Sequence, residues 1–494
     1  MKLKPGFDHR VGAIAIGAVV AGLLVLASVT ATSAAGSPRS ARAAISASAK
    51  APPAYLPGVV IVGYHQPGPA AAADTAGPAP GSAVQTKLLH LRGGVTVSGE
   101  LRRLKRQRGV AFAVPDYVAH IADAAPSPGW TPNDPGAAST PQGWTRMQWN
   151  FLAQAGVNAP GAWANLLGVH RAGARGVVIA ILDTGVAFRN WHQYRKAPDF
   201  TWTHFVHPYD FVAGNRYPLD REGHGTFVAG TIAESTNNAF GLTGLAYNAS
   251  IMPLRVLNRD GWGDAATISR GIRYAATHGA QVINLSLEFD PSVTAGEIPT
   301  IMSAIRFAHR RGVVVVAASG NEGSRRIAYP ARARAVISVG ATTMDRCLAY
   351  YSNGGRRLDL VAPGGGDDAD LPRDPNCHPD RNLPDIAQMT FGNPLHPDRF
   401  GYPNGWYGTS MAAPQVAAVA AMVIASGVIG RHPSPDQILA RLEATAQPLG
   451  GTKPNPDYGY GLLDAAAATT PGPAQPPGAP PSSSSPATPA PAAR

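Results

Sequence analysis

Cysteine is scarce in this 494-residue chain, which contains only Cys347 and Cys377. A structural zinc site needs closely spaced Cys or His pairs, and no second pair stands at ligand spacing beside Cys377 and His378. The sequence therefore gives no support for such a site. In an exported protein the two cysteines are instead candidates for a single disulfide, which would close a loop of about 30 residues.

Charged residues are also few, at 15% of the chain, and basic residues outnumber acidic ones by 42 to 31. The net charge of +11 would favour nucleic acid or a membrane surface if it were spread over the chain. However, residues 1–125 carry thirteen Lys and Arg against five Asp and Glu, a net +8, which leaves +3 for residues 126–494. We therefore expect neither nucleic acid nor a membrane as a stable partner.

Two segments lack the apolar residues that packing requires. Residues 36–55 are rich in Ala, Ser and Pro and predict a linker, while the Pro- and Ser-rich residues 470–494 predict a disordered tail. The chain as a whole is 45% hydrophobic, which is ample for a large folded core.

The N-terminus has the pattern of a secretion signal. Basic residues precede an uncharged run from Val11 to Val29, and the small residues Ser33 and Ala35 that follow suit cleavage by signal peptidase. We predict a signal peptide at 1–35 and a secreted, extracellular protein. The alternative is an uncleaved membrane anchor, because the run approaches the roughly 20 residues that span a bilayer.

Residues 56–124 have the pattern of a small α+β module. The alternating segment LPGVVIVGYH predicts a strand, and VSGELRRLKRQRGVAFAVPDYVAHI predicts a helix followed by a strand. Ser98 is the expected N-cap of this helix, and Gly109 is its expected end. We expect this module to be separate from the larger domain at 125–469.

Residues 125–469 predict an α/β domain. Short apolar strands alternate with helices that have an Ala-rich face, which indicates a doubly wound, mostly parallel sheet with helices on both faces. The predicted strands are 177–182, 251–257, 281–287, 313–318 and 335–340, and the predicted helices are 264–279 and 297–312.

Four residues stand where parallel sheets place their functional groups, after a strand or at the start of a helix. They are Asp183 in ILDTG, His224 in GHGTFVAGTIA, Asn321 in AASGNEG and Ser410 in GTSMAAPQVAA. Each alone is also a common turn or cap residue. Together they supply a nucleophilic hydroxyl, an imidazole base, a carboxylate that orients it and an amide donor for an oxyanion, which is the chemistry of acyl transfer.

Aspartic peptidases use the same DTG sequence in a different chemistry, which requires two such carboxylates. This chain has one DTG, followed by Val186, so that mechanism would need a homodimer and would leave the other three motifs unused. We therefore favour the serine mechanism.

The four motifs, in the order Asp, His, Ser, resemble those of the subtilase family of serine peptidases. The resemblance implies a subtilisin-like fold that hydrolyses protein or peptide substrates through an acyl-enzyme, with Asp183, His224 and Ser410 as the triad and Asn321 in the oxyanion hole. It implies no catalytic cofactor. It also implies that residues 56–124 are an inhibitory and chaperone prodomain, which the enzyme removes from itself. We expect a monomer.

The resemblance further implies a structural calcium site in the segment STNNAFGLTGLA. Calcium prefers oxygen ligands, and the candidates are Asn238 and the carbonyls of Thr236, Phe240 and Leu242. The aspartate that would complete the site corresponds to Asp199, which follows an insertion, so its participation is left open. An Asn-rich turn without metal is the alternative.

The segments similar to the family's substrate-binding strands are Gly261, Trp262 and Gly263, and Ser286, Leu287, Glu288 and Phe289. The family has glycine after Ser-Leu, and here Glu288 and Phe289 replace it. We expect narrowed specificity, with Glu288 either attracting a basic side chain or pointing to solvent. Trp262 is expected to form the wall of a hydrophobic subsite.

Two other functions stay open at this point. A subtilase fold without activity would serve as a secreted binding protein, although no catalytic position is substituted. A membrane-tethered processing peptidase with one narrow target would follow if Val11–Val29 were not cleaved.

Overall fold

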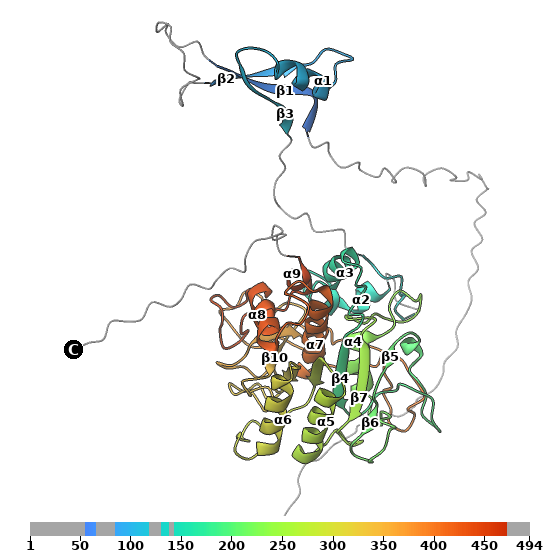
Figure 1. The fold of residues 1–494 in the computed structure, drawn as a ribbon. Helices are drawn as coiled ribbons and strands as arrows, with labels where there is room; N and C mark the ends of the chain where they lie inside the picture. Colours follow the sequence, from blue (N-terminus) through green and yellow to red (C-terminus); the bar gives the residue numbers. More distant parts are fainter. Residues whose placement is uncertain (1–54, 66–83, 118–129, 138–142, 472–494) are drawn as a thin grey trace, which may run out of the picture. The chain divides into compact units, whose positions relative to one another are not determined.

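The computed structural model describes residues 55–65, 84–117, 130–137 and 143–471 (Figure 1). The predicted signal peptide, most of the linker and most of the C-terminal tail lie outside these residues. The chain divides into two compact units, Met1–Asp123 and Ala124–Arg494, which are described in turn.

The first unit contains a three-stranded antiparallel sheet and one helix. The strands are β1 (Tyr55–His65), β2 (Val84–His90) and β3 (Val110–Tyr117), in the order β2-β1-β3. The helix α1 (Val97–Leu104) buries its first and last residues against Val60, Val62 and Ala113 of the sheet. Strand β2 was not predicted from the sequence.

The two ends of α1 differ from the prediction. Thr96, not Ser98, is the N-cap: its hydroxyl accepts a hydrogen bond from the Gly99 N–H at 3.2 Å. The helix ends at Leu104, and Gly109 lies in the turn before β3 with φ +89°, a conformation that favours glycine. Ser and Thr both suit an N-cap, so residue type alone did not separate two candidates that are two positions apart.

The second unit is built on an eight-stranded sheet in which all strand pairs are parallel. The order is β11-β10-β9-β8-β4-β7-β5, with β6 beside β7. The bounds are β4 Val178–Asp183, β5 His204–Phe205, β6 Tyr209–Asp210, β7 Ser250–Arg255, β8 Val282–Leu285, β9 Val314–Ala318, β10 Ile337–Thr342 and β11 Leu360–Pro363. The predicted doubly wound parallel sheet is confirmed, while β5, β6 and β11 were missed.

Helices cover both faces of this sheet (Figure 1). The α-helices of this unit are α2 Trp144–Met147, α3 Ala159–Gly168, α4 His224–Ala233, α5 Ala265–Thr277, α6 Pro299–Arg310, α7 Thr409–Ser426, α8 Pro435–Thr445 and α9 Ala465–Thr469. Two 3-10 turns, η1 Trp149–Phe151 and η2 Pro198–Phe200, complete the set. Alternate strand residues face two cores: Ile179 and Ile181 pack with α4 and α7, and Ala180 and Leu182 pack with α5 and α6.

The helix α7 forms the centre of one core. Its Ala, Val and Met side chains are buried from Met411 to Val423. Pro414 lies inside the helix and has no N–H to donate to the Ser410 carbonyl, which accepts a hydrogen bond from the Ser286 hydroxyl instead. By length and composition α7 is the one helix among the described residues that could cross a membrane, but 78% of it is buried inside the domain. A buried core helix has the same composition as a membrane span.

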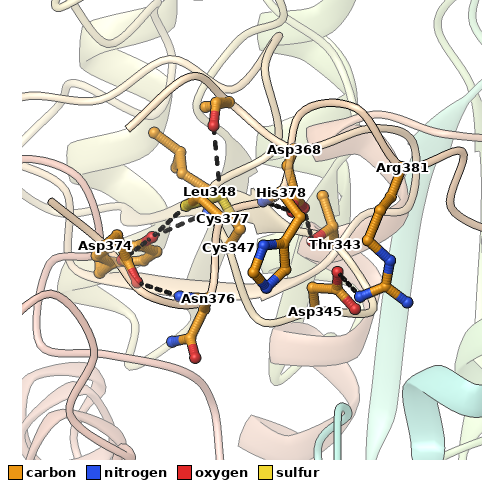
Figure 2. Close-up of a disulfide and its surroundings, with 12 residues drawn as sticks. Thr343, Asp345, Cys347, Leu348, Asp368, Asp374, Asn376, Cys377, His378 and Arg381 are labelled. Atoms are coloured by element: carbon orange, nitrogen blue, oxygen red, sulfur yellow. Dashed lines mark hydrogen bonds and ion pairs between the residues drawn. A yellow bond between two sulfur atoms is a disulfide. The ribbon is translucent and has the colours of Figure 1, made fainter. Parts of the chain in front are cut away.

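A disulfide joins Cys347, which follows β10, to Cys377 in the loop after β11, residues 364–380, which is rich in Asp and is called the acidic loop (Figure 2). Cys347 is fully buried. The Tyr458 hydroxyl next to the bridge accepts a hydrogen bond from the Leu348 N–H at 3.0 Å and donates one to Asp374 at 2.6 Å. The bridge therefore fixes the acidic loop against the end of the sheet.

We predict that a Cys347→Ala/Cys377→Ala variant loses about 3 kcal/mol of unfolding free energy, because a loop of 30 residues is then free in the unfolded chain. Chemical denaturation of the variant and the wild type measures the loss. Single variants serve as controls and should lose a similar amount, since either one breaks the bond. Equal midpoints for wild type and double variant would contradict this prediction.

Candidate active site

The strand order reverses beside β4, which has β7 on one side and β8 on the other. Open α/β sheets bind ligands at the carboxyl ends of strands next to such a reversal. Asp183 is the last residue of β4 and is completely buried. Its Oδ1 atom accepts hydrogen bonds from His224 Nδ1 at 2.8 Å and from the Thr184 N–H at 2.7 Å.

His224 begins α4, and glycine makes its approach to Asp183 possible. A Cβ atom on Gly225 would lie 2.0 Å from the carbonyl oxygen of Gly185, so only glycine lets the start of the helix contact the turn after β4. Gly185 itself has φ +110°. Two predicted residues, far apart in the sequence, are thereby held within one hydrogen bond of each other.

Asp220 is a site residue that the sequence analysis missed. Its Oδ1 accepts from the Thr184 hydroxyl at 2.9 Å and from the Gly223 N–H at 3.0 Å, and its Oδ2 accepts from the Thr226 N–H at 2.8 Å. The buried carboxylate thus ties the turn after β4 to the first turn of α4. Asp is a typical turn former, so the sequence indicates a turn at Asp220 before Gly223 but not its contact with Thr184.

The charges around His224 change its pKa. Burial alone would lower the pKa of the imidazole, but the negative charges of Asp183, Glu222 and Asp220 together outweigh burial and raise it to about 9. Glu222, also missed from the sequence, accepts a hydrogen bond from the His224 N–H at 2.8 Å. Burial raises the pKa of Glu222 above its ordinary value, and His224 opposes that shift.

Ser410 is the second residue of α7, where backbone N–H groups and the helix dipole favour negative charge. Its hydroxyl donates to the carbonyl oxygen of Ser286 at 3.3 Å, and its own carbonyl accepts from the Ser286 hydroxyl at 2.8 Å. Helices α4 and α7 pack against each other, and Trp406 stacks on Phe227 of α4. Among the described hydrogen bonds none joins His224 to Ser410, and such bonds often form only with substrate bound.

The amide of Asn321 is oriented by Thr409. The Asn321 Oδ1 atom accepts from the Thr409 N–H at 2.8 Å and from its hydroxyl at 3.0 Å, so the Nδ2 atom must face the other way. There it donates to Glu288 Oε1 at 3.3 Å. Glu288 therefore does not point to solvent, which was one of its two expected orientations.

The predicted substrate segments lie around one cavity of about 280 Å³. His224 and Glu222 line this cavity together with Gly261, Trp262, Gly263, Ser286, Leu287, Glu288 and Phe289. Trp262 is largely exposed, at 76% of its surface. The structure thus brings the imidazole and both segments to a single concave surface.

The predicted calcium loop contacts two buried carboxylates. Asp199 accepts from the Asn238 amide at 2.7 Å and from the Leu242 N–H at 3.0 Å, and Asp134 accepts from the Asn238 N–H at 2.9 Å. The insertion therefore does not separate Asp199 from the loop. Within the described residues no group of three or more His, Cys, Asp or Glu side chains is arranged to hold a metal ion.

Together, the parallel sheet, the buried carboxylate bonded to histidine and the serine at a helix start define the class of α/β serine hydrolases. Within that class the chain belongs to the subtilase family, because the sequence model of that family matches residues 174–461. The protein is a subtilisin-like serine proteinase, and the resemblance stated from its motifs is confirmed.

Known proteins similar to this chain are also proteases. A thermophilic serine proteinase from Bacillus sp. (strain AK1) is 34% identical over 367 residues, which cover 74% of each chain. Subtilisin BL from Lederbergia lenta is 37% identical over 300 residues, covering 60% of this chain and 91% of that protein. Among solved structures, a protease from Pseudoalteromonas arctica PAMC 21717 aligns with a TM-score of 0.55 and 30% identity, over 69% of this chain and 99% of that one.

Proposed function

We propose that this protein is a secreted serine endopeptidase whose triad is Asp183, His224 and Ser410, with Asn321 as an oxyanion donor. The observation that carries the proposal is the 2.8 Å hydrogen bond between buried Asp183 and His224 at the reversal of strand order. A serine at the start of the neighbouring α7 supports it.

In this mechanism the Ser410 hydroxyl oxygen attacks the carbonyl carbon of the scissile peptide bond, and His224 accepts the hydroxyl proton at Nε2. Asp183 holds the proton on Nδ1 of His224, which fixes the tautomer and stabilises the imidazolium. The oxyanion accepts hydrogen bonds from Asn321 Nδ2 and the Ser410 N–H. The intermediate then collapses, the amine leaves with the proton from His224, and water releases the acyl group from Ser410 by the same steps.

The proposal includes maturation. The first unit forms its own small core of Val60, Val62, Val97, Leu104 and Ala113, which supports a separately folding prodomain at 56–124. We propose that the enzyme removes this prodomain itself, after a signal peptide at 1–35 has directed the chain out of the cell.

We expect the precursor 36–494 to shed its first segment in the wild type, while a Ser410→Ala variant stays full length because it has no nucleophile. Mass spectrometry of both proteins over time measures precursor size and the new N-terminus. A Ser426→Ala variant, at the far end of α7, is the control and should mature normally. Maturation of Ser410→Ala without added protease would refute the triad.

The pKa of His224 predicts the pH dependence of activity. The base must be neutral, so kcat/KM should rise with pH and be half-maximal near the free-enzyme pKa of about 9. A Glu222→Gln variant removes one of the charges that raise this pKa and should move the half-maximal pH down by about 1 unit. Asp380→Asn, which removes an exposed charge elsewhere, is the control. A profile that Glu222→Gln leaves unmoved would contradict the electrostatic account.

We also propose that the loop after α4 binds structural calcium. The donor types suit a hard cation: the loop contains the Asn238 side chain and the carbonyls of Thr236, Phe240 and Leu242, and the carboxylates of Asp134 and Asp199 contact this loop. Burial and, to a smaller extent, the charge of Asp134 raise the pKa of Asp199 to about 7. The hydrogen bonds that Asp199 accepts from Asn238 and Leu242 act in the opposite direction. A divalent cation would offset this repulsion between carboxylates.

Chelation should therefore lower the melting temperature of the mature protein, and calcium should restore it. At a free calcium concentration of about 100 times Kd, binding should add roughly 2.7 kcal/mol to the free energy of unfolding. Asn238→Ala should reduce the calcium-dependent shift, and the exposed Asn382→Ala should keep it. A melting temperature that calcium and chelator leave unchanged in the wild type argues against the site.

A further inference from the structure

Glu288 has a position that the peptidase mechanism does not explain. It lies just after β8 in the wall of the cavity that His224 also lines. Its Oε1 accepts from Asn321 Nδ2 at 3.3 Å, whereas its Oε2 is buried and has no hydrogen-bond partner among the described residues. A buried carboxylate oxygen without a donor is costly, so a hydrogen-bond donor or a cation at Oε2 would stabilise the ionised form of Glu288.

The surroundings of Glu288 are negative. Burial, and then the charge of nearby Glu322, raise the pKa of Glu288 to about 7, although its bonds to Asn321 oppose the shift. Among the described ion pairs, none joins a Lys or Arg to Glu288 or Glu322. The residues that line the cavity include the carboxyl groups of Glu288 and Glu222 and no Lys or Arg, and Glu322 adds its charge beside Glu288. A basic side chain that enters the cavity therefore meets no Lys or Arg already paired with Glu288.

The backbone leaves room for this carboxyl group. A Cβ atom on Gly320 would lie 2.4 Å from Glu288 Oε2 and 2.1 Å from the Asn353 amide. Gly320 also has φ +114°, which side-chain-bearing residues rarely adopt. The glycine between β9 and Asn321 thus opens the space in which the carboxyl group is held.

The position of Asn321 relates Glu288 to the substrate. The oxyanion that Asn321 is proposed to bind is the carbonyl oxygen of the residue on the N-terminal side of the cut. The side chain of that same residue starts on the adjacent Cα atom. Since Glu288 is one hydrogen bond away from the Asn321 amide, the long stem of a Lys or Arg side chain at this position can reach it.

We propose that Glu288, supported by Glu322, binds the ammonium or guanidinium group of a Lys or Arg residue that directly precedes the scissile bond. The proposal rests on the peptidase function above and assigns its substrate class as peptides cut after a basic residue. The cation completes the hydrogen bonding of Glu288 Oε2. It also replaces the Asn321 amide as partner of Oε1, which frees Asn321 Nδ2 for the oxyanion.

The test is a set of peptides that differ only in the residue before the cut: Lys, Arg, Leu, Phe or Glu. We measure kcat/KM for the mature protein at about pH 9, where a carboxyl group with a pKa of about 7 is ionised. The wild type should prefer Lys and Arg. Glu288→Gln should lower the ratio of kcat/KM for the Lys and Arg peptides to kcat/KM for the Leu peptide by about 10- to 100-fold, because a charged hydrogen bond to the basic side chain is lost.

Three further variants make the result specific. Glu288→Asp keeps the charge and should retain a preference for Lys and Arg, and Glu322→Gln should weaken that preference less than Glu288→Gln does. Asp380→Asn removes a remote, exposed charge and should behave as the wild type. Thermal melting of each variant checks that it is folded.

The proposal is overturned if the folded wild type cleaves after Leu or Phe as efficiently as after Lys. It is also overturned if Glu288→Gln changes all five peptides equally, since Glu288 would then act only through Asn321. Labelling of Ser410 by a fluorophosphonate separates the two levels of failure. If Ser410 is labelled but the enzyme does not prefer Lys or Arg before the cut, only the proposed substrate specificity is refuted. If the wild type is neither labelled nor active, the peptidase function is refuted and this inference with it.

Discussion

The hydrogen bond between Asp183 and His224 is the contact on which the geometry of the site depends. A buried carboxylate at the end of a central strand needs hydrogen-bond donors, and here the imidazole and the Thr184 N–H both donate to its Oδ1 atom. The bond requires α4 to start against the turn after β4, which the glycine at 225 permits and Asp220 secures. The apolar packing of α4 and α7 on the same sheet face then places Ser410 on this side of the domain.

Buried carboxylates occur at three sites in this domain, and at each site the proposed partner is a cation. Beside Asp183 the cation is the imidazolium that forms during catalysis. In the loop after α4 it is calcium. Glu234, which directly follows α4, also lies there, and burial and the charges of Asp199 and Asp134 raise its pKa well above its ordinary value. Beside Glu288 the cation is the side chain of the substrate. Because burying a negative charge is unfavourable without a partner, these three sites are the parts of the domain most sensitive to what binds them.

The elements predicted correctly are those with long, regular patterns. Strands such as β4 and β9 are apolar on both faces, and helices such as α5 have a repeating apolar face, so local sequence specifies them. The two-residue β5 and β6 were missed because they are too short to have a period and exist through pairing with the longer β7. Strand β11 was also missed, although it has four residues like the predicted β8. The cap of α1 was assigned to Ser98 instead of Thr96 because both residue types suit the position.

The sequence by itself determined the family, the parallel α/β fold and the candidates Asp183, His224, Asn321 and Ser410, because glycine-flanked polar motifs at strand and helix ends are local patterns. Only the tertiary structure decided which of these side chains meet and which other groups act on them. The roles of Asp220 and Glu222 and the inward orientation of Glu288 depend on distances between segments that are far apart along the chain. Burial and charge at those distances set the pKa of His224, and no local pattern encodes them.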